Sequence, residues 1–471
     1  AAAAPAGGRA LALGSAPRPV PVSGGAAPGG RAALPDLAAC RLLSALVLAT
    51  AVLVVVGSFV AAGMAEEQVL VDCDLDKEPL WLVDRACAWR CCICFGVSCG
   101  TCAFGQNTFT LFVRPIAEGV GVDLALASLV YTVHNCGIGI YSMPAVWLAE
   151  KCGMRSLFRV GIILTGVAFF ALSRASCITT FCGSYALLGI AVGAVYSPCV
   201  MATLRLMPPE LQGAACGLVS MSFPGGGTLL SFPVSWGIST FGMANVYGAM
   251  GLGSVCILGA CLLILPDEGH EVILQASSEV EPEEEEGSNR RVGWVGCAAL
   301  IMTYMLGMCA FNLVESDMEP ILAASLPDGL ASFGVSLGLV AHTMGYAFLG
   351  IAAGTRSAAW CLIFSGVVMA ICILLWAFVA TSPWTAGCRS VQLLLSTAVA
   401  FFLPSHIVLA PVVIQRTTSP GTAPMLFAAI CFSDAAGVAA PLFTRLSAYL
   451  GWGSTLCVLA ALPSLMVLNV V

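Results

Sequence analysis

Apolar runs of about 20 residues or more recur along this chain, and they constrain its fold more than any other feature. Each run is long enough to cross a hydrocarbon layer of about 30 Å as an α-helix, which rises about 1.5 Å per residue. Charged residues make up 10% of the 471 residues, against about 25% in soluble domains. We therefore predict an all-α integral membrane protein with many spans. The twelve runs lie at 89–113, 124–148, 157–176, 178–204, 211–236, 243–265, 293–313, 329–353, 358–380, 390–414, 422–443 and 450–470.

Polar segments divide the chain into regions. The acidic stretch 266–291 contains the run Glu283–Glu286 and has no apolar periodicity, so it predicts a flexible linker. It separates six apolar runs from the next six, and we expect two six-helix bundles. The predicted regions are a disordered or targeting segment (1–37), an additional hydrophobic helix or targeting anchor (38–64), an acidic connector (65–88), an N-terminal bundle (89–265), the acidic linker (266–291) and a C-terminal bundle (292–471).

Basic residues in the connectors predict the orientation of the helices. Cytosolic loops carry an excess of Lys and Arg. The connectors on the side of the acidic linker hold eight such residues, against four on the other side. We therefore expect the linker and both ends of the twelve-run array to face the cytosol. The eight are Lys151, Arg155, Arg159, Arg205, Arg290, Arg291, Arg356 and Arg416, and the four are Arg114, Arg174, Arg389 and Arg445.

Composition and motifs exclude several classes of function. The net charge is −7 and no basic stripe is present, so nucleic-acid binding is not expected. The patterns H-E-x-x-H, G-x-S-x-G and the Walker loop do not occur, so we expect neither an enzyme nor a nucleotide-driven pump. The cysteines between Cys87 and Cys102 lack the paired spacing of zinc sites. We interpret them as helix packing, with acylation of Cys87, Cys91 or Cys92 as an alternative. No metal or other cofactor is expected, and the expected partners are membrane lipids and a small-molecule solute.

Polar side chains inside the apolar runs are the candidates for solute binding. Tyr131, His134 and Asn135 lie at positions i, i+3 and i+4 and therefore share one face of their helix. The alternative for each is a hydrogen bond to a neighbouring helix, worth about 0.6 kcal/mol on average. The first run offers Gln106 but no Lys. Single candidates elsewhere are Asn107, Tyr196, Asn312, His342 and His406.

Asp434 is a carboxylate within a predicted span. A charged group at a helix centre costs about 2.5–3.5 kcal/mol on insertion scales, and such groups usually face a cavity or a partner. Asp434 therefore has three interpretations: it takes up a proton, it holds an amino group, or it stays protonated and hydrogen-bonded.

The connector between the second and third runs carries a motif. LAEKCGMRSLFRVG at 148–161 combines Glu150, Lys151, Gly153 and Arg155. It resembles the loop signature between helices 2 and 3 of the major facilitator superfamily, and a six-plus-six layout with a cytosolic linker is similar to that family. The resemblance implies a secondary transporter that works by alternating access. It also implies that these four residues form a latch that stabilises one conformation without touching solute.

A longer likeness covers about 104–268. FGQNTFTLFVRPIAEGVGVDLALASLVYT and GIAVGAVYSPCVMATLRLMPPELQGAACGLVSMSFPGGG resemble the monocarboxylate and oxalate/formate carriers. That resemblance implies a monocarboxylate solute. Carriers of this group typically hold the carboxylate with a cation in helix 8 or helix 11, whereas this chain has His342 and Asp434 there.

A membrane site without Lys or Arg disfavours a bare anion. We therefore expect the monocarboxylate to move with a coupling proton. A neutral amino acid, with Asp434 available to its ammonium group, is the alternative solute. A transport-inactive receptor or scaffold is the alternative for the whole protein.

Overall fold

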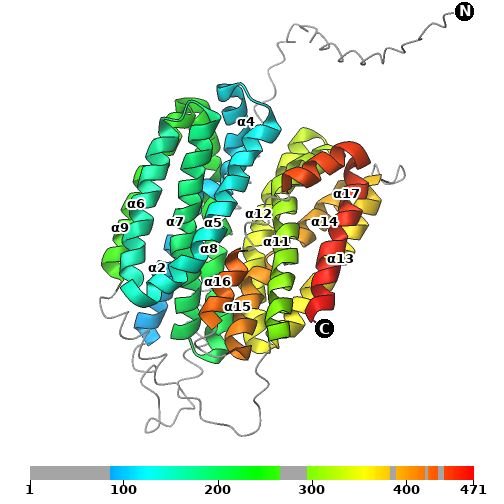
Figure 1. Cartoon of the computed structure of the whole chain (residues 1–471). Helices are drawn as coiled ribbons and strands as arrows, with labels where there is room; N and C mark the ends of the chain where they lie inside the picture. The colour runs from blue at the N-terminus through cyan, green and yellow to red at the C-terminus, as the bar shows by residue number, and fades with distance from the viewer. Residues whose placement is uncertain (1–84, 266–293, 382–388, 419–422, 433–439, 471) are drawn as a thin grey trace, which may run out of the picture. The chain divides into compact units, whose positions relative to one another are not determined.

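The computed structural model describes residues 85–265, 294–381, 389–418, 423–432 and 440–470 (Figure 1). All of them belong to one compact unit. Every regular element in these residues is an α-helix. The predicted segments 1–37, 38–64 and 266–291, most of 65–88, and Asp434 lie outside the described residues.

The helices fall into two sets, before and after residues 266–293. We call α2–α9 the N-terminal helices and α11–α17 the C-terminal helices. The N-terminal helices are α2 (Arg85–Cys102), α3 (Phe104–Asn107), α4 (Phe109–Val120), α5 (Leu124–Cys152), α6 (Met154–Ser173), α7 (Ile178–Leu206), α8 (Pro209–Phe241) and α9 (Met243–Ile264). The C-terminal helices are α11 (Trp294–Ala323), α12 (Asp328–Thr355), α13 (Ala358–Thr381), α14 (Arg389–Phe402), α15 (Ser405–Thr417), α16 (Ala423–Cys431) and α17 (Ala440–Val470).

Each set packs mainly on itself. In the N-terminal set, α5 and α6 pack on α7, which carries an unbroken buried stretch from Ala191 to Leu204. In the C-terminal set, α17 packs on α11 and α13, while α14 packs on α12. The buried cysteines Cys91, Cys92, Cys94, Cys99 and Cys102 take part in the packing of α2 as small apolar side chains.

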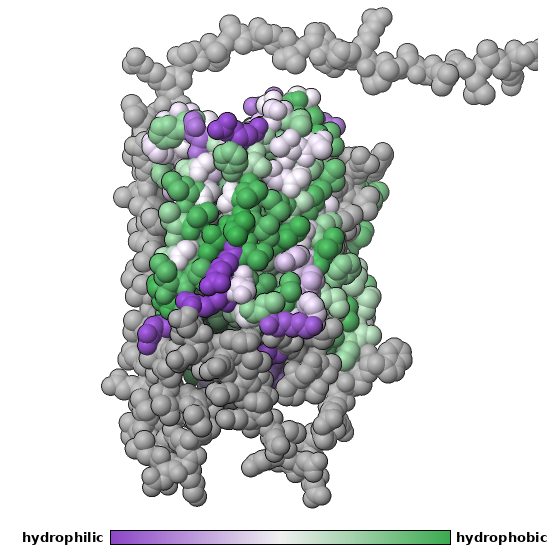
Figure 2. All heavy atoms as spheres, turned by 60° about the vertical axis from the view of Figure 1, so that its left-hand side comes forward, coloured by the Kyte–Doolittle hydropathy of each residue, from purple (hydrophilic) through white to green (hydrophobic). Residues whose placement is uncertain are grey.

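Lipid-facing surface is visible in the exposed side chains. Leu263, Trp360 and Phe170 are 84%, 70% and 65% exposed, which is suited to a hydrocarbon environment and not to water. Figure 2 shows that apolar side chains cover most of the middle of one face. Within the described residues, eight helical stretches are long and apolar enough to cross a membrane.

Two predicted runs differ from the helices observed. The first run is divided into α2, α3 and α4, with breaks near Ala103 and Thr108. The run 293–313 continues as α11 to Ala323, because apolar residues keep a helical spacing beyond its predicted end. Val314, Met318, Ile321 and Leu322 are all buried there. The extension brings Glu315 and Asp317 into the helix.

Close contacts join the two sets along α8 and α12. A Cβ atom added at Gly213 would lie 2.5 Å from the carbonyl oxygen of Gly350, and one at Gly217 would lie 2.7 Å from that of Tyr346. Side chains other than hydrogen therefore do not fit at Gly213 and Gly217 while the helices remain at this distance.

Candidate functional site

The predicted face of α5 is buried. Tyr131, His134 and Asn135 are 8%, 0% and 2% exposed. The helix is started by Asp123, whose side chain accepts a hydrogen bond from the backbone N–H of Leu126. The three side chains point to one side because their spacing follows the helical repeat, as predicted from the sequence.

His134 is fixed by two neighbours. Its Nδ1 lies 3.0 Å from the carbonyl oxygen of Tyr185 on α7, and its Nε2 lies 3.1 Å from Oε1 of Gln106 on α3. α5 and α7 approach closely here, since Gly189 of α7 lies against the backbone carbonyl of His134. The hydroxyl of Tyr185 lies 3.1 Å from that of Tyr247 on α9. Both tyrosines are fully buried. The imidazole of His134, which α5 carries, thus lies against α3 and α7.

A chain of three side-chain amides leads from His134 to the C-terminal helices. Nε2 of Gln106 donates to Oδ1 of Asn135 at 3.5 Å, and Nδ2 of Asn135 donates to Oδ1 of Asn312 on α11 at 3.2 Å. We call Gln106, Asn135 and Asn312 the amide chain. Its last bond joins Asn135 of α5 to Asn312 of α11, which lie 177 residues apart in the sequence.

A second polar bond between the two sets lies one helical turn earlier along α5 and one turn later along α11. The hydroxyl of Tyr131 donates to Oε2 of Glu315 on α11 at 3.2 Å. Glu315 is partly buried, and no Lys, Arg or His side chain of the described residues forms an ion pair with it. Glu315 thus has no cationic partner in that part of the chain. We did not predict Glu315 from the sequence, because the apolar run was ended at residue 313; its position three residues after Asn312 was the available signal.

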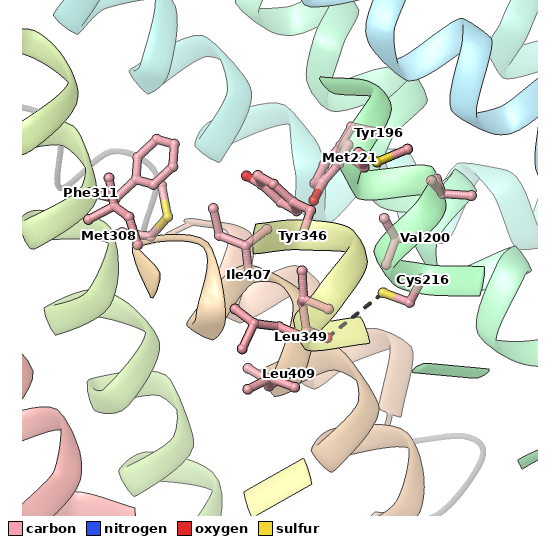
Figure 3. Packing of buried hydrophobic residues seen from close by; sticks show 14 of the residues in the cluster. Tyr196, Val200, Cys216, Met221, Met308, Phe311, Tyr346, Leu349, Ile407 and Leu409 are labelled. Atoms are coloured by element: carbon pink, nitrogen blue, oxygen red, sulfur yellow. Dashed lines mark hydrogen bonds between the residues drawn. The ribbon is translucent and has the colours of Figure 1, made fainter. Parts of the chain in front are cut away.

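Two further candidates, His342 on α12 and His406 on α15, lie around Phe311 of α11. Their ring centroids are 5.2 Å and 6.1 Å from that of Phe311. Nε2 of His406 lies 3.1 Å from Sδ of Met308. Figure 3 shows Phe311 and Met308 close together on α11, near Ile407 of α15. We call Met308, Phe311, His342 and His406 the histidine cluster.

Three of the candidate residues each have a buried polar atom with no hydrogen-bond partner among the described residues. These atoms are Nδ2 of Asn312, Nε2 of His342 and Nδ1 of His406. Their residues are 1%, 4% and 0% exposed. Leaving a buried polar group unpaired costs about 1–3 kcal/mol.

The remaining single candidates lie elsewhere. Asn107 donates to the carbonyl oxygens of Ala103 and Phe223 and thereby joins α3 to α8. The hydroxyl of Tyr196 lies 3.4 Å from that of Ser220, and its ring packs on Phe223. Both residues have the helix-to-helix contacts that were the alternative to solute binding.

The latch residues lie at the junction of α5 and α6. Gly153 has a φ of 79° and ends α5 before α6 begins, a conformation that favours glycine. Nη2 of Arg155 donates to the carbonyl of Leu262 at 3.2 Å, near the end of α9, where helix carbonyls lack backbone partners. Nζ of Lys151 lies 3.9 Å from the ring centroid of Trp147. Glu150 is in the last turn of α5, and its side chain lies outside the described part.

Among the described residues, no group of three or more His, Cys, Asp or Glu side chains gathers in a way that could hold a metal ion.

Comparisons with known proteins agree with this fold. The sequence profile described as Major Facilitator Superfamily matches residues 93–441. The structure of the proton:xylose symporter XylE bound to 6-bromo-6-deoxy-D-glucose has a TM-score of 0.69 at 12% identity, covering 82% of this chain and 95% of that chain. The E. coli fucose:proton symporter FucP has a TM-score of 0.60 at 13% identity, covering 83% and 98%. The human organic anion transporter MFSD10 has a TM-score of 0.60 at 14% identity, covering 84% and 100%.

Proposed function

The chain belongs to the major facilitator superfamily of transporters, and on that basis we propose that it carries a small organic monocarboxylate together with a proton. The family assignment confirms the predicted all-helical transporter fold, a multi-pass integral membrane protein and a secondary transporter instead of an enzyme. The identity of the solute and of the coupling ion is what we propose beyond the family assignment.

The three unpaired buried atoms of Asn312, His342 and His406 carry the proposal. His342 and His406 lie around Phe311 among α11, α12 and α15, while Asn312, the next residue of α11, bonds to Asn135 of α5. A carrier of this architecture binds its solute near the membrane midplane, between its halves. Hydrogen-bonding atoms beside an apolar ring and a thioether suit a molecule with a polar head and a short apolar body. A small monocarboxylic acid has that shape, and the resemblance of 104–268 to monocarboxylate carriers favours the same class.

The charges near this region favour a coupled proton. In α3, α5, α11, α12 and α15, the Lys and Arg residues are Lys151 and Arg416, both in the last turn of a helix. The central region offers Glu315 instead. An acidic region with no cation penalises a bare carboxylate, so the solute is accepted with a proton. XylE and FucP are described as proton symporters and MFSD10 as an organic anion transporter, which supports both parts of the proposal.

The proton has two proposed sites. Asp434 is the site proposed from the sequence. The second proposed site consists of His134, which bonds to Gln106 and Tyr185, and Glu315, which bonds to Tyr131. The latch assignment of Glu150, Lys151, Gly153 and Arg155 is also retained, as a proposal that these residues set the balance between conformations.

Uptake into proteoliposomes tests the proposal. Full-length protein is reconstituted, and uptake of radiolabelled lactate, leucine and glucose is measured with and without an inward proton gradient. We expect lactate uptake to rise as the external pH falls and to drop when a protonophore is added. Lactate uptake at the same rate with and without the proton gradient, or uptake of leucine alone, contradicts the proposal.

The variant Asp434→Asn separates the two proton sites in the same assay. Loss of the pH dependence assigns the proton to Asp434, while a retained pH dependence assigns it to His134 and Glu315. If Asp434 instead holds an ammonium group, Asp434→Asn removes competition by amino acids at every pH.

A further inference from the structure

The hydrogen bonds of His134 define which of its nitrogens carries hydrogen. A backbone carbonyl can only accept, so Nδ1 donates to the carbonyl of Tyr185. The neutral imidazole therefore has its lone pair on Nε2, which faces the amide of Gln106 at 3.1 Å. Rotation of a side-chain amide by 180° exchanges its oxygen and NH2 group in place, so either end of Gln106 can face Nε2.

Each protonation state of His134 permits one direction of bonding along the amide chain. Neutral His134 needs a donor at Nε2, so Gln106 presents its NH2 group there. Its oxygen then accepts from Asn135, whose oxygen accepts from Asn312. The atom of Asn312 left unpaired is its carbonyl oxygen.

The imidazolium form reverses every hydrogen bond between His134 and Asn312, while Nδ1 still donates to the carbonyl of Tyr185. Nε2–H donates to Oε1 of Gln106, Nε2 of Gln106 donates to Asn135, and Nδ2 of Asn135 donates to Asn312. The atom left unpaired is Nδ2 of Asn312, as in this structure. The end of the chain thus changes from a hydrogen-bond acceptor to a donor when a proton binds at Nε2 of His134.

We propose that the amide chain transmits the protonation state of His134 to Asn312 and thereby makes carboxylate binding conditional on a proton. This inference rests on the proposed monocarboxylate function. An N–H group at Asn312 binds a carboxylate oxygen, whereas a carbonyl oxygen at the same place repels it. Because the coupling is reciprocal, a bound carboxylate also stabilises the proton on His134. The proton adds to the lone pair of Nε2, no other covalent bond changes, and its release restores the acceptor end.

Other titratable groups surround this path. Tyr131 and Tyr185 have ring centroids 6.4 Å and 5.9 Å from that of His134. Glu315 reaches the same face through its hydrogen bond with Tyr131. Further charged or titratable residues lie on α5 itself and on the described helices packed against it. Lys151 lies in the last turn of α5. The neighbouring helices carry Arg114 and Glu118 (α4, both exposed), Arg155 and Arg159 (first turns of α6), Arg205 (last turn of α7) and Cys431 (end of α16).

Proton uptake on solute binding tests the relay. Binding of lactate to the full-length protein in nanodiscs is measured by calorimetry in buffers of different ionisation enthalpy. Above the pH at which His134 titrates, we expect about one proton to be taken up per lactate, and the affinity to fall about tenfold per pH unit.

The variant Gln106→Met interrupts the chain while preserving side-chain volume, and lactate binding should no longer take up a proton. Gln212→Met makes the same exchange at a buried glutamine of α8, which donates to the carbonyl of Leu204, and should retain proton uptake. Asn312→Asp keeps the acceptor for Asn135 but removes the donor, so lactate affinity should fall about tenfold or more. Proton uptake that survives Gln106→Met but disappears in Glu315→Gln overturns the relay and leaves the proposed function intact.

Histidine-selective 15N NMR gives a readout that needs no solute. The signals of His134 are assigned with His134→Gln, and we expect the neutral form to carry hydrogen on Nδ1. Hydrogen on Nε2 overturns the relay even if lactate fails to bind, while failure of lactate to bind a protein with the expected tautomer counts against the proposed function alone.

Discussion

At the scale of single residues, the central region combines satisfied and unsatisfied polar groups. His134 and Asn135 have partners on both sides, whereas Asn312, His342 and His406 each keep one buried atom unpaired among the described residues. The paired groups fix the geometry of the N-terminal side. The unpaired groups are the ones for which a solute offers a gain in hydrogen bonding.

Gly307→Ala should displace His406. A Cβ atom at Gly307 would lie 2.4 Å from Cγ of His406 and 2.7 Å from its Nδ1, so the ring must move away from Met308. Overpacking of this kind costs about 1–3 kcal/mol. We expect a lower melting temperature in thermal unfolding and weaker solute binding. Gly253→Ala is the control, because no heavy atom lies within 4 Å of its added Cβ; equal behaviour of the two variants would show that the position of His406 is unimportant.

At the scale of helices, two pairs join the two sets by different kinds of contact. α5 and α11 are joined by the polar bonds of Asn135 and Tyr131 near the start of α5. α8 and α12 are joined by glycines near the start of α8 and the end of α12. Because consecutive helices alternate in direction, these two groups of contacts lie toward opposite sides of the membrane. Alternating access requires each group to separate in turn.

Gly213→Leu should disfavour the conformation in which α8 and α12 are packed. The added side chain meets the backbone of Gly350 and Gly354, and overpacking by about 1–3 kcal/mol shifts a conformational equilibrium by about tenfold per 1.4 kcal/mol. We expect faster hydrogen exchange in α8 and α12 and slower transport. Gly259→Leu on α9, where the added Cβ meets nothing within 4 Å, should leave both rates near those of the unmodified protein. Unchanged exchange in Gly213→Leu would contradict a closing role for this helix pair.

Arg155→Gln should change the rate of transport without changing its selectivity. The variant loses the hydrogen bond to the carbonyl of Leu262, and a bond to a charged group is worth about 1.5–3 kcal/mol before solvent screening. The maximal uptake rate is expected to change severalfold, while the order of preference among competing solutes stays the same. Arg159→Gln, at an exposed position of the same helix, is the matched control. An altered order of solutes at an unchanged rate would refute the latch assignment.

At the scale of the whole molecule, the helices form one transporter fold whose orientation is predicted by its basic residues. The described part includes Lys151, Arg155 and Arg159 near the α5–α6 junction and Arg416 at the end of α15. All of them belong to the eight basic residues assigned to the cytosolic side. The histidine cluster and the amide chain then lie between that side and the opposite one, within the membrane-spanning helices.

An epitope inserted after Glu286 tests this orientation. The segment 266–291 lies outside the described residues, and its cytosolic location is predicted from the eight-to-four distribution of Lys and Arg. In cells expressing the full chain, antibody added on the non-cytosolic side should bind this epitope only after the membrane that holds the protein has been permeabilised. A second epitope placed in 382–388, a connector predicted on the other side, is the control and should show the opposite pattern.

The sequence by itself determined the elements and their faces. Apolar runs longer than the hydrocarbon thickness can satisfy their backbone polar groups only as helices, so the all-helical membrane fold followed from composition and length. The helical repeat placed Tyr131, His134 and Asn135 on one face because that relation depends on neighbouring residues alone.

The tertiary structure decided which faces meet. The partners of Asn135 and Tyr131 are Asn312 and Glu315, which lie 177 and 184 residues away, and helical periodicity carries no information about a partner at that distance. The same reason applies to His406 and Met308, 98 residues apart. Glu315 was missed because hydropathy ends a predicted helix at its first acid, whereas burial of the opposite face continues α11 to Ala323.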